Sequence, residues 1–192
     1  MLSFAGCGAG NEVSAESKTT ATAEVSQWDE LGQDEITKAM GMGWDLGNQL
    51  EASNAGIPSE TAWGNPVITE DLIKKVKEQG FKTVRIPVSY LLKIGDAPDY
   101  TIDKAWLDRV QEVVDYVVGN DLYAIINIHG DGYYTVDKSW LLCVDDNQDE
   151  IKEKYEKVWA QIADRFKDYD EHLIFESMNE EFDNTYGKPN AE

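Results

Sequence analysis

Short apolar runs alternate with longer segments of helical period along the chain from about residue 36. The runs have the length expected of strands and cover residues 42–46, 81–88, 122–128 and 173–178. Residues 122–128 are nearly all apolar, which is typical of a strand whose two faces are both covered. Four strands are therefore predicted.

Three helices are predicted between these strands, over residues 69–80, 103–119 and 149–166. Such alternation indicates parallel strands joined by helical crossovers. Two α/β architectures have this pattern, a doubly wound sheet and a (β/α)8 TIM barrel. No glycine-rich dinucleotide motif and no phosphate-binding loop follows any of the runs.

Polar side chains recur where each predicted strand ends. Asn48 follows the first run, Arg85 lies near the end of the second, Asn127 and His129 end the third, and Asn179–Glu180 follow the fourth. In a (β/α)8 barrel the active site forms at the carboxyl ends of the strands. This recurrence favours the barrel over the doubly wound sheet.

Side-chain alternation in the fourth run places Glu176 on the same side as Glu180. If Glu180 lies over the barrel mouth, Glu176 points into the barrel, where a carboxylate needs a partner. Arg85 on the second run is the expected partner of Glu176, Glu180 or both. The alternative is a solvated Glu176.

Composition narrows the class of substrate. The 192 residues include 37 acidic and 17 basic side chains, for a net charge of −20. Such a surface repels phosphate backbones and polyanions, so nucleic acids and pectin-like polymers are disfavoured. The six Trp and nine Tyr suit neutral sugars, although large cores use aromatic residues too. No apolar run approaches the length that spans a membrane.

The first 34 residues differ in composition from the rest. Residues 11–26 are rich in Ala, Ser, Thr and Glu without apolar period, which predicts a flexible linker. Small residues before Cys7 resemble a bacterial lipobox, although the apolar stretch is short and lacks a basic start. We expect a secreted protein or one anchored by lipid at the bacterial cell surface. The alternative is an incidental cysteine.

Five motifs occur in order along the chain, namely Gly43–Asn48, Glu60–Pro66, Val84–Ser89, Ile126–His129 and Leu173–Glu180. Together they resemble glycoside hydrolase family 5, especially its subfamily 4 of endo-β-glucanases and xyloglucanases. The resemblance covers residues 35–192 and implies a (β/α)8 barrel that hydrolyses β-1,4-glucans such as cellulose, xyloglucan or mixed-linkage glucan. It implies no cofactor and no metal.

The resemblance also implies a retaining mechanism with two carboxylates. By motif match Glu180 is the acid/base, Asn179 bonds the sugar 2-hydroxyl, and Arg85 steadies the nucleophile. His129 matches the histidine that lines the site of the cleaved sugar. Asn48 and Trp63 match the first loop, where sugars farther from the cleavage point would rest.

One aromatic residue of the loop after the third strand is also expected at a sugar subsite, because sugars stack on aromatic faces. The candidates are Tyr133, Tyr134 and Trp140, and Tyr133 is selected for the site. The alternative is that these aromatic residues pack under a long loop.

Three positions depart from the family pattern. Many relatives have His-His at His129–Gly130, Asn-Glu-Pro-Arg at Asn179–Phe182, and Asn at Asp45. None of these differences removes the acid/base, but they affect the fine specificity of the cleft.

The family's nucleophile is a Glu at the end of the seventh strand, and only four strands are predicted here. Glu181, Asp183 and Asp131 lack its sequence context. We therefore expect the first four β/α units of a barrel, with the acid/base but without the nucleophile, and inactive alone. The alternatives are an inactive carbohydrate-binding remnant, and a mannanase or xylanase of the same clan.

Overall fold

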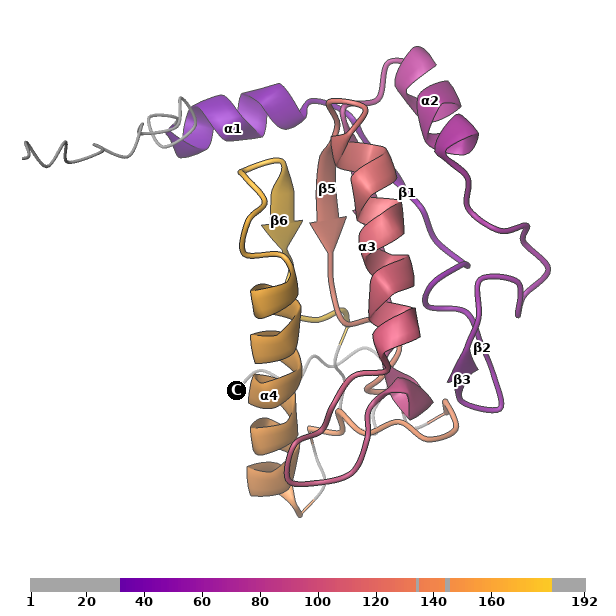
Figure 1. Cartoon of the computed structure of the whole chain (residues 1–192), viewed down its shortest axis with the longest axis vertical. Coiled ribbons are helices and arrows are strands. Elements are labelled where there is room, and N and C mark those ends of the chain that lie inside the picture. Colours follow the sequence, from indigo (N-terminus) through magenta and orange to yellow (C-terminus); the bar gives the residue numbers. More distant parts are fainter. Residues whose placement is uncertain (1–31, 134, 144–145, 181–192) are drawn as a thin grey trace, which may run out of the picture. The chain divides into compact units, whose positions relative to one another are not determined.

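The computed structural model describes residues 32–133, 135–143 and 146–180, and its centre is a parallel four-stranded sheet (Figure 1). The strands are β1 (Gly43–Asp45), β4 (Thr83–Ile86), β5 (Tyr123–Ile126) and β6 (Leu173–Phe175), in the order β1-β4-β5-β6. Each strand pairs with the next one along the chain, without the reversal of a doubly wound sheet. The four strand predictions are confirmed, and the order fits the wall of a barrel.

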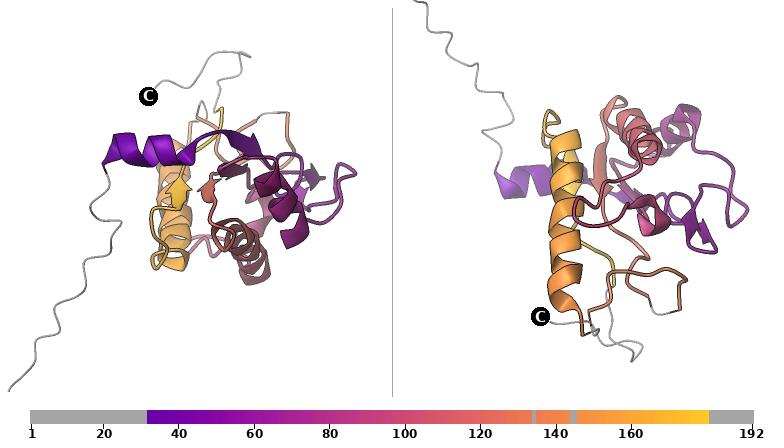
Figure 2. Two further views of the ribbon diagram at one scale, coloured as in Figure 1. Left: turned by 90° about the horizontal axis from the view of Figure 1, so that it is seen from above. Right: turned by 60° about the horizontal axis from the view of Figure 1, so that its bottom comes forward.

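Three helices connect the strands, as predicted. They are α2 (Glu70–Glu78), α3 (Lys104–Val118) and α4 (Gln148–Arg165). The side chain of Thr69 accepts a hydrogen bond from Leu72 N at the start of α2, and Asp103 accepts one from Trp106 N at the start of α3. Seen along the strands, the three helices cover the same side of the sheet (Figure 2), as in the helical layer of a barrel.

Several short elements are not predicted by the sequence pattern. They are α1 (Gln33–Met40), the hairpin strands β2 (Ser53–Asn54) and β3 (Ile57–Pro58), and the 3₁₀ turn η2 (Leu91–Lys93). Helix α1 has only eight residues and none of them is buried, so its apolar period is too short to reveal a helix in a sequence. It lies near the end of the sheet where the strands begin (Figure 1).

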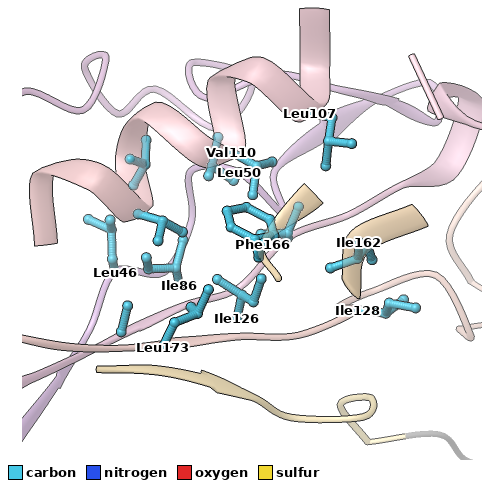
Figure 3. Close-up of a cluster of buried hydrophobic side chains, with 14 of the residues drawn as sticks. Leu46, Leu50, Ile86, Leu107, Val110, Ile126, Ile128, Ile162, Phe166 and Leu173 are labelled. Atoms are coloured by element: carbon cyan, nitrogen blue, oxygen red, sulfur yellow. The ribbon is translucent and has the colours of Figure 1, made fainter. Parts of the chain in front are cut away.

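The core fills the space between the sheet and the helices (Figure 3). Ile86, Ile126 and Leu173 project from the strands toward Val110 of α3 and Ile162 of α4. Because side chains alternate along a strand, the intervening residues face the opposite side of the sheet. That side carries the polar residues described below.

The helix-facing side of β6 is only partly covered. Phe175 is 44% exposed and lies in an apolar groove with Tyr155, Trp159 and Ser177. Among the described residues, β6 pairs with β5 alone. A further β/α unit would bury this groove and this strand edge.

No helix in the described part of the chain has the length and apolar composition needed to cross a membrane. The lipobox expected at Cys7 and the linker expected at residues 11–26 lie outside the described residues.

Candidate active site

The polar residues of the strand ends are brought together because the chain segments stay side by side after the strands end. His129 N donates a hydrogen bond to Val88 O (2.8 Å), and Asn179 N donates one to Ile128 O (3.0 Å). These contacts continue the register of the sheet into the loops. The carboxyl ends of the strands therefore form one rim, as in a barrel.

Arg85 is the centre of a hydrogen-bonded cluster on the side of the sheet away from the helices. Its Nε and Nη2 donate to Glu176 Oε2 (2.7 Å) and Oε1 (2.5 Å), and Nη2 also donates to Asn179 Oδ1 (2.8 Å). Nη1 donates to Asp45 Oδ1 (3.3 Å), and Asn127 Nδ2 donates to Glu176 Oε1 (2.9 Å). The predicted contact between Arg85 and Glu176 is confirmed, so Glu176 is not a merely solvated side chain.

The charges of this cluster are fixed by their neighbours. The hydrogen bonds from Arg85 hold the pKa of Glu176 below its usual value, and the same bonds raise the pKa of Arg85. Burial lowers the pKa of His129, and the positive charge of Arg85 lowers it further. The cluster thus contains an ionised carboxylate–guanidinium pair beside a neutral imidazole at neutral pH.

Glu180 is connected to this cluster through two intermediate side chains. Arg85 donates to Asn179, Asn179 Nδ2 donates to the Tyr133 hydroxyl (3.3 Å), and that hydroxyl donates to Glu180 Oε2 (2.7 Å). Glu180 has a φ of 47°, in the left-handed region that non-glycine residues seldom adopt. Such backbone strain is common at functional sites.

A cleft of about 420 Å³ lies at this rim. Five of the predicted site residues line it, namely Asn48, Trp63, His129, Tyr133 and Glu180. The other two, Arg85 and Asn179, are joined to Glu180 by the hydrogen bonds described above.

Trp63 offers the most exposed large apolar surface of the cleft. Its side chain is 55% exposed, and its indole N–H donates to Ser53 O (3.0 Å) in the hairpin. The ring is therefore held in place while part of it stays accessible, which suits a planar platform for a sugar.

Glu51 also lines the cleft, and the sequence analysis missed it. Its carboxylate accepts hydrogen bonds from the backbone N–H groups of Asn48 and Gln49, and burial raises its pKa. Asn48 has a φ of 64°, and its carbonyl accepts from Asn65 Nδ2 (2.7 Å). Glu51 thus holds the first loop in its turn. The only signal in the sequence is a carboxylate between the apolar neighbours Leu50 and Ala52.

The aromatic residues of the loop after β5 have different surroundings. Trp140 donates its indole N–H to Asp131 Oδ2 (2.8 Å), and the ammonium of Lys154 lies 4.6 Å from the centre of its ring. Trp140 is thus held under the loop by polar contacts on two sides. Tyr133 reaches the cleft, and Tyr134 lies outside the described residues.

Asp131 is the buried anchor of this loop, with no exposed surface. Its carboxylate accepts hydrogen bonds from Ser89 Oγ (2.7 Å), from the backbone N–H of Tyr90 and from the Trp140 indole. Its carbonyl accepts from the backbone N–H groups of Trp140 and Leu141. Asp131 therefore ties the loop that carries Tyr133 to the end of β4.

The buried Asp131 should make the stability of the protein depend on pH. Burial raises its pKa to about 6, above the usual value of 3.8. Because the folded state binds the proton more tightly than the unfolded state, this group favours folding at acid pH, and that contribution is lost as the pH rises through about 6. Two pKa units correspond to roughly 3 kcal/mol.

Asp131→Asn is the matched variant, because an amide can still accept from Tyr90 and Trp140 while donating to Ser89 Oγ. Urea unfolding of both proteins between pH 4 and pH 7.5 should show the wild type losing stability relative to the variant as the pH rises. Parallel stability curves would show that Asp131 does not titrate with a raised pKa.

Comparison with known proteins now assigns a family to this arrangement. The family model described as cellulase (glycosyl hydrolase family 5) matches residues 46–191, which include every residue of the cluster and the cleft except Asp45. The chain belongs to glycosyl hydrolase family 5.

Relatives in family 5 are similar over most of this chain. Endoglucanase A of Paenibacillus barcinonensis is 57% identical over 157 residues, which are 82% of this chain and 39% of that protein. Cellulase/esterase CelE of Acetivibrio thermocellus is 52% identical over 146 residues, or 76% of this chain and 17% of that protein. The chain spans less than half the length of these curated relatives.

Solved structures of family 5 members agree with the fold. A family 5 xyloglucanase from Paenibacillus pabuli is 63% identical, with a TM-score of 0.79 over 81% of this chain and 44% of that one. A subfamily 4 broad-specificity endoglucanase from Ruminococcus champanellensis with bound cellotriose is 44% identical, with a TM-score of 0.75 over 86% and 47% of the two chains. The resemblance to family 5 and its subfamily 4 is confirmed.

The structure describes the surroundings of two positions that depart from the family 5 pattern, Asp45 and Gly130. Asp45 places a second carboxylate beside Arg85. Gly130 has a φ of 83°, so a side chain there would strain the backbone although it would meet no neighbouring atom within 4 Å. Glu181 and Asp183 lie outside the described residues, and the described residues contain no group of three side chains able to hold a metal ion.

Proposed function

We propose that this chain is the N-terminal part of a retaining endo-β-1,4-glucanase that cleaves neutral β-glucans such as cellulose, xyloglucan or mixed-linkage glucan. The observation that carries the proposal is the placement of Glu180 in the cleft, linked through Tyr133 and Asn179 to the Arg85–Glu176 pair. The relatives named as endoglucanases and a xyloglucanase support the same class of substrate.

Five side chains in or beside the cleft have a place in this reaction. Glu180 protonates the leaving glycosidic oxygen and later takes a proton from water. Asn179 is held by Arg85 through its oxygen, so an amide hydrogen can reach the sugar 2-hydroxyl. The neutral His129 can bond a hydroxyl without adding charge, and Asn48 and Trp63 bind sugars beyond the cleavage point.

The nucleophile is proposed to lie in the part of the relatives that this chain does not match. Both oxygens of Glu176 already accept hydrogen bonds from Arg85, which leaves Glu176 poorly suited to attack a sugar carbon. Among the residues with described positions no strand pairs with the outer edge of β6, and this edge and the groove around Phe175 suit the packing of further β/α units. By this proposal the chain is inactive until the barrel is complete.

The net charge of −20 also supports a neutral polymer as the substrate, since a polyanion would be repelled. Polysaccharides do not cross membranes, so the enzyme must meet them outside the cell. We therefore propose a protein that is secreted or anchored by lipid at Cys7. Acid/base chemistry of this kind uses two carboxylates and needs no cofactor.

The test uses the complete barrel. This protein consists of the present chain followed by the C-terminal portion that is found in its relatives and is not matched by this chain. Xyloglucan, barley glucan, hydroxyethyl cellulose, mannan and xylan are supplied separately, and viscosity, new reducing ends and anomeric NMR signals are followed. A rapid fall in the viscosity of the glucans is expected, with the β-anomer appearing first.

Other outcomes separate the alternatives. Cleavage of mannan or xylan alone would assign a different hydrolase of the clan. Binding to glucans without turnover would indicate a carbohydrate-binding protein. First release of the α-anomer would contradict retention.

A further inference from the structure

The hydroxyl of Tyr133 makes two specific contacts at the candidate site. It donates to Glu180 Oε2 (2.7 Å) and accepts from Asn179 Nδ2 (3.3 Å). A side chain that acted only by stacking on a sugar would need neither contact. The predicted platform is thus bonded directly to the candidate acid/base.

The backbone of Tyr133 is also fixed. Its carbonyl accepts hydrogen bonds from Ser139 Oγ (2.6 Å) and from the backbone N–H of Val136 (2.9 Å). Asp131 closes the same loop at its base through Trp140 and Leu141. The hydroxyl therefore approaches Glu180 from a loop that is anchored at two points.

We propose that Tyr133 is a positioning residue for Glu180 and that it acts through its hydroxyl. This inference rests on the proposed role of Glu180. Oε2 of Glu180 is held by Tyr133, whereas Oε1 accepts no hydrogen bond from any described residue. Oε1 is thus left to carry the proton to the glycosidic oxygen.

The contact persists through both halves of the reaction. When Glu180 is protonated on Oε1, Oε2 still accepts from Tyr133, and the ionised carboxylate accepts in the same way. The hydroxyl takes no part in proton transfer. It fixes the orientation of the Glu180 carboxyl plane. Its hydrogen bond from Asn179, which itself accepts from Arg85, ties that orientation to the position of Arg85.

Tyr133→Phe and Tyr133→Ala, made in the complete barrel, separate the hydroxyl from the ring. Loss of the hydroxyl alone should lower kcat on cellotetraose by about 10- to 100-fold, the effect of losing a hydrogen bond to a charged group, with KM changed by less than about twofold. On 2,4-dinitrophenyl cellobioside, whose leaving group needs no protonation, kcat/KM should fall by less than about threefold.

A matched control removes the same kind of bond elsewhere. The Tyr116 hydroxyl on α3 donates a hydrogen bond to Glu112 (2.8 Å) on the helix surface. Tyr116→Phe should therefore leave the kinetic constants on both substrates unchanged. Ser139→Ala keeps the Tyr133 hydroxyl but loosens its backbone, and a smaller loss of kcat is expected.

Several outcomes would overturn the proposal. A Tyr133→Phe variant that matches the wild type, together with a Tyr133→Ala variant that raises KM, would establish stacking. Equal losses on both substrates, or unfolding of Tyr133→Phe, would make the hydroxyl structural. Full activity of Glu180→Gln on cellotetraose would refute the proposed function itself. If Glu180→Gln is inactive and Tyr133→Phe is fully active, only the role of Tyr133 is refuted.

Discussion

Glu180→Gln is expected to lower kcat/KM of the complete barrel on cello-oligosaccharides by about 10²- to 10⁴-fold, the usual contribution of general acid–base catalysis. The amide keeps the size of the side chain and can still accept the hydrogen bond from Tyr133. It cannot donate a proton to an alkoxide leaving group. The fold should be unchanged, so the thermal unfolding midpoint provides the check on stability.

The leaving group distinguishes loss of the acid from general damage. Glu180→Gln should keep most of the kcat/KM of the wild type on 2,4-dinitrophenyl cellobioside, because dinitrophenolate departs without protonation. The second step still lacks its base, so kcat on that substrate should fall. In Glu180→Ala, azide should raise kcat and yield the β-glycosyl azide, since azide attacks without a base.

Glu78→Gln, on the exposed end of α2, is the matched control and should leave all rates unchanged. A comparable loss of kcat/KM on the natural and the dinitrophenyl substrates would contradict the role of Glu180 as the acid. The α-glycosyl azide as product would contradict retention.

The sequence predicts the sheet and the arginine cluster because both follow from local periodicity. Strand positions appear as apolar runs, and alternation along the predicted run 173–178 directs Glu176 to the side of the sheet away from the helices, where Arg85 lies. The observed strands are shorter than the predicted runs, since only three or four residues of each run form the ladder with a neighbouring strand. Periodicity therefore locates a strand better than it locates its ends.

Features that depend on the course of a loop could not be predicted. Tyr133 is an aromatic residue on a long loop, a pattern that predicts stacking on a sugar. The hydroxyl reaches Glu180 because the loop turns back on Asp131, and this contact has no signal in the sequence. Glu51 was missed for a similar reason, because a carboxylate that caps its own turn has no partner distant in the sequence.

Arg85→Met is expected to have the second large effect, and it acts on stability and on catalysis together. The guanidinium supplies two hydrogen bonds to Glu176 and one to Asn179, and methionine supplies none. Because the Arg85 and Glu176 side chains are 26% and 32% exposed, water can replace part of the loss. We expect the free energy of unfolding to fall by about 1–3 kcal/mol at pH 7.

Catalysis should suffer more than stability. Asn179 loses the donor to its oxygen, so its amide no longer holds Tyr133, and the orientation of Glu180 is lost with it. A fall in kcat of about 10²- to 10³-fold is expected from misplacement of this kind. Arg85→Lys should recover only part of it, because an ammonium cannot present the planar fork that both Glu176 oxygens require.

The pH dependence of stability separates loss of the ion pair from loss of packing. Arg85 lowers the pKa of Glu176 in the folded state, so the pair contributes stability above the unfolded pKa of Glu176, and that contribution is lost as the pH falls through the folded value. The destabilisation by Arg85→Met, measured by urea unfolding, should therefore become smaller as the pH is lowered from 7 to about 3.5.

Adding Glu176→Met to Arg85→Met should restore part of the stability at pH 7, because it removes the unpaired carboxylate. A loss that is constant with pH and unrelieved in the double variant would mean that Arg85 acts by packing, and the link from Arg85 to Glu180 would then have to be abandoned.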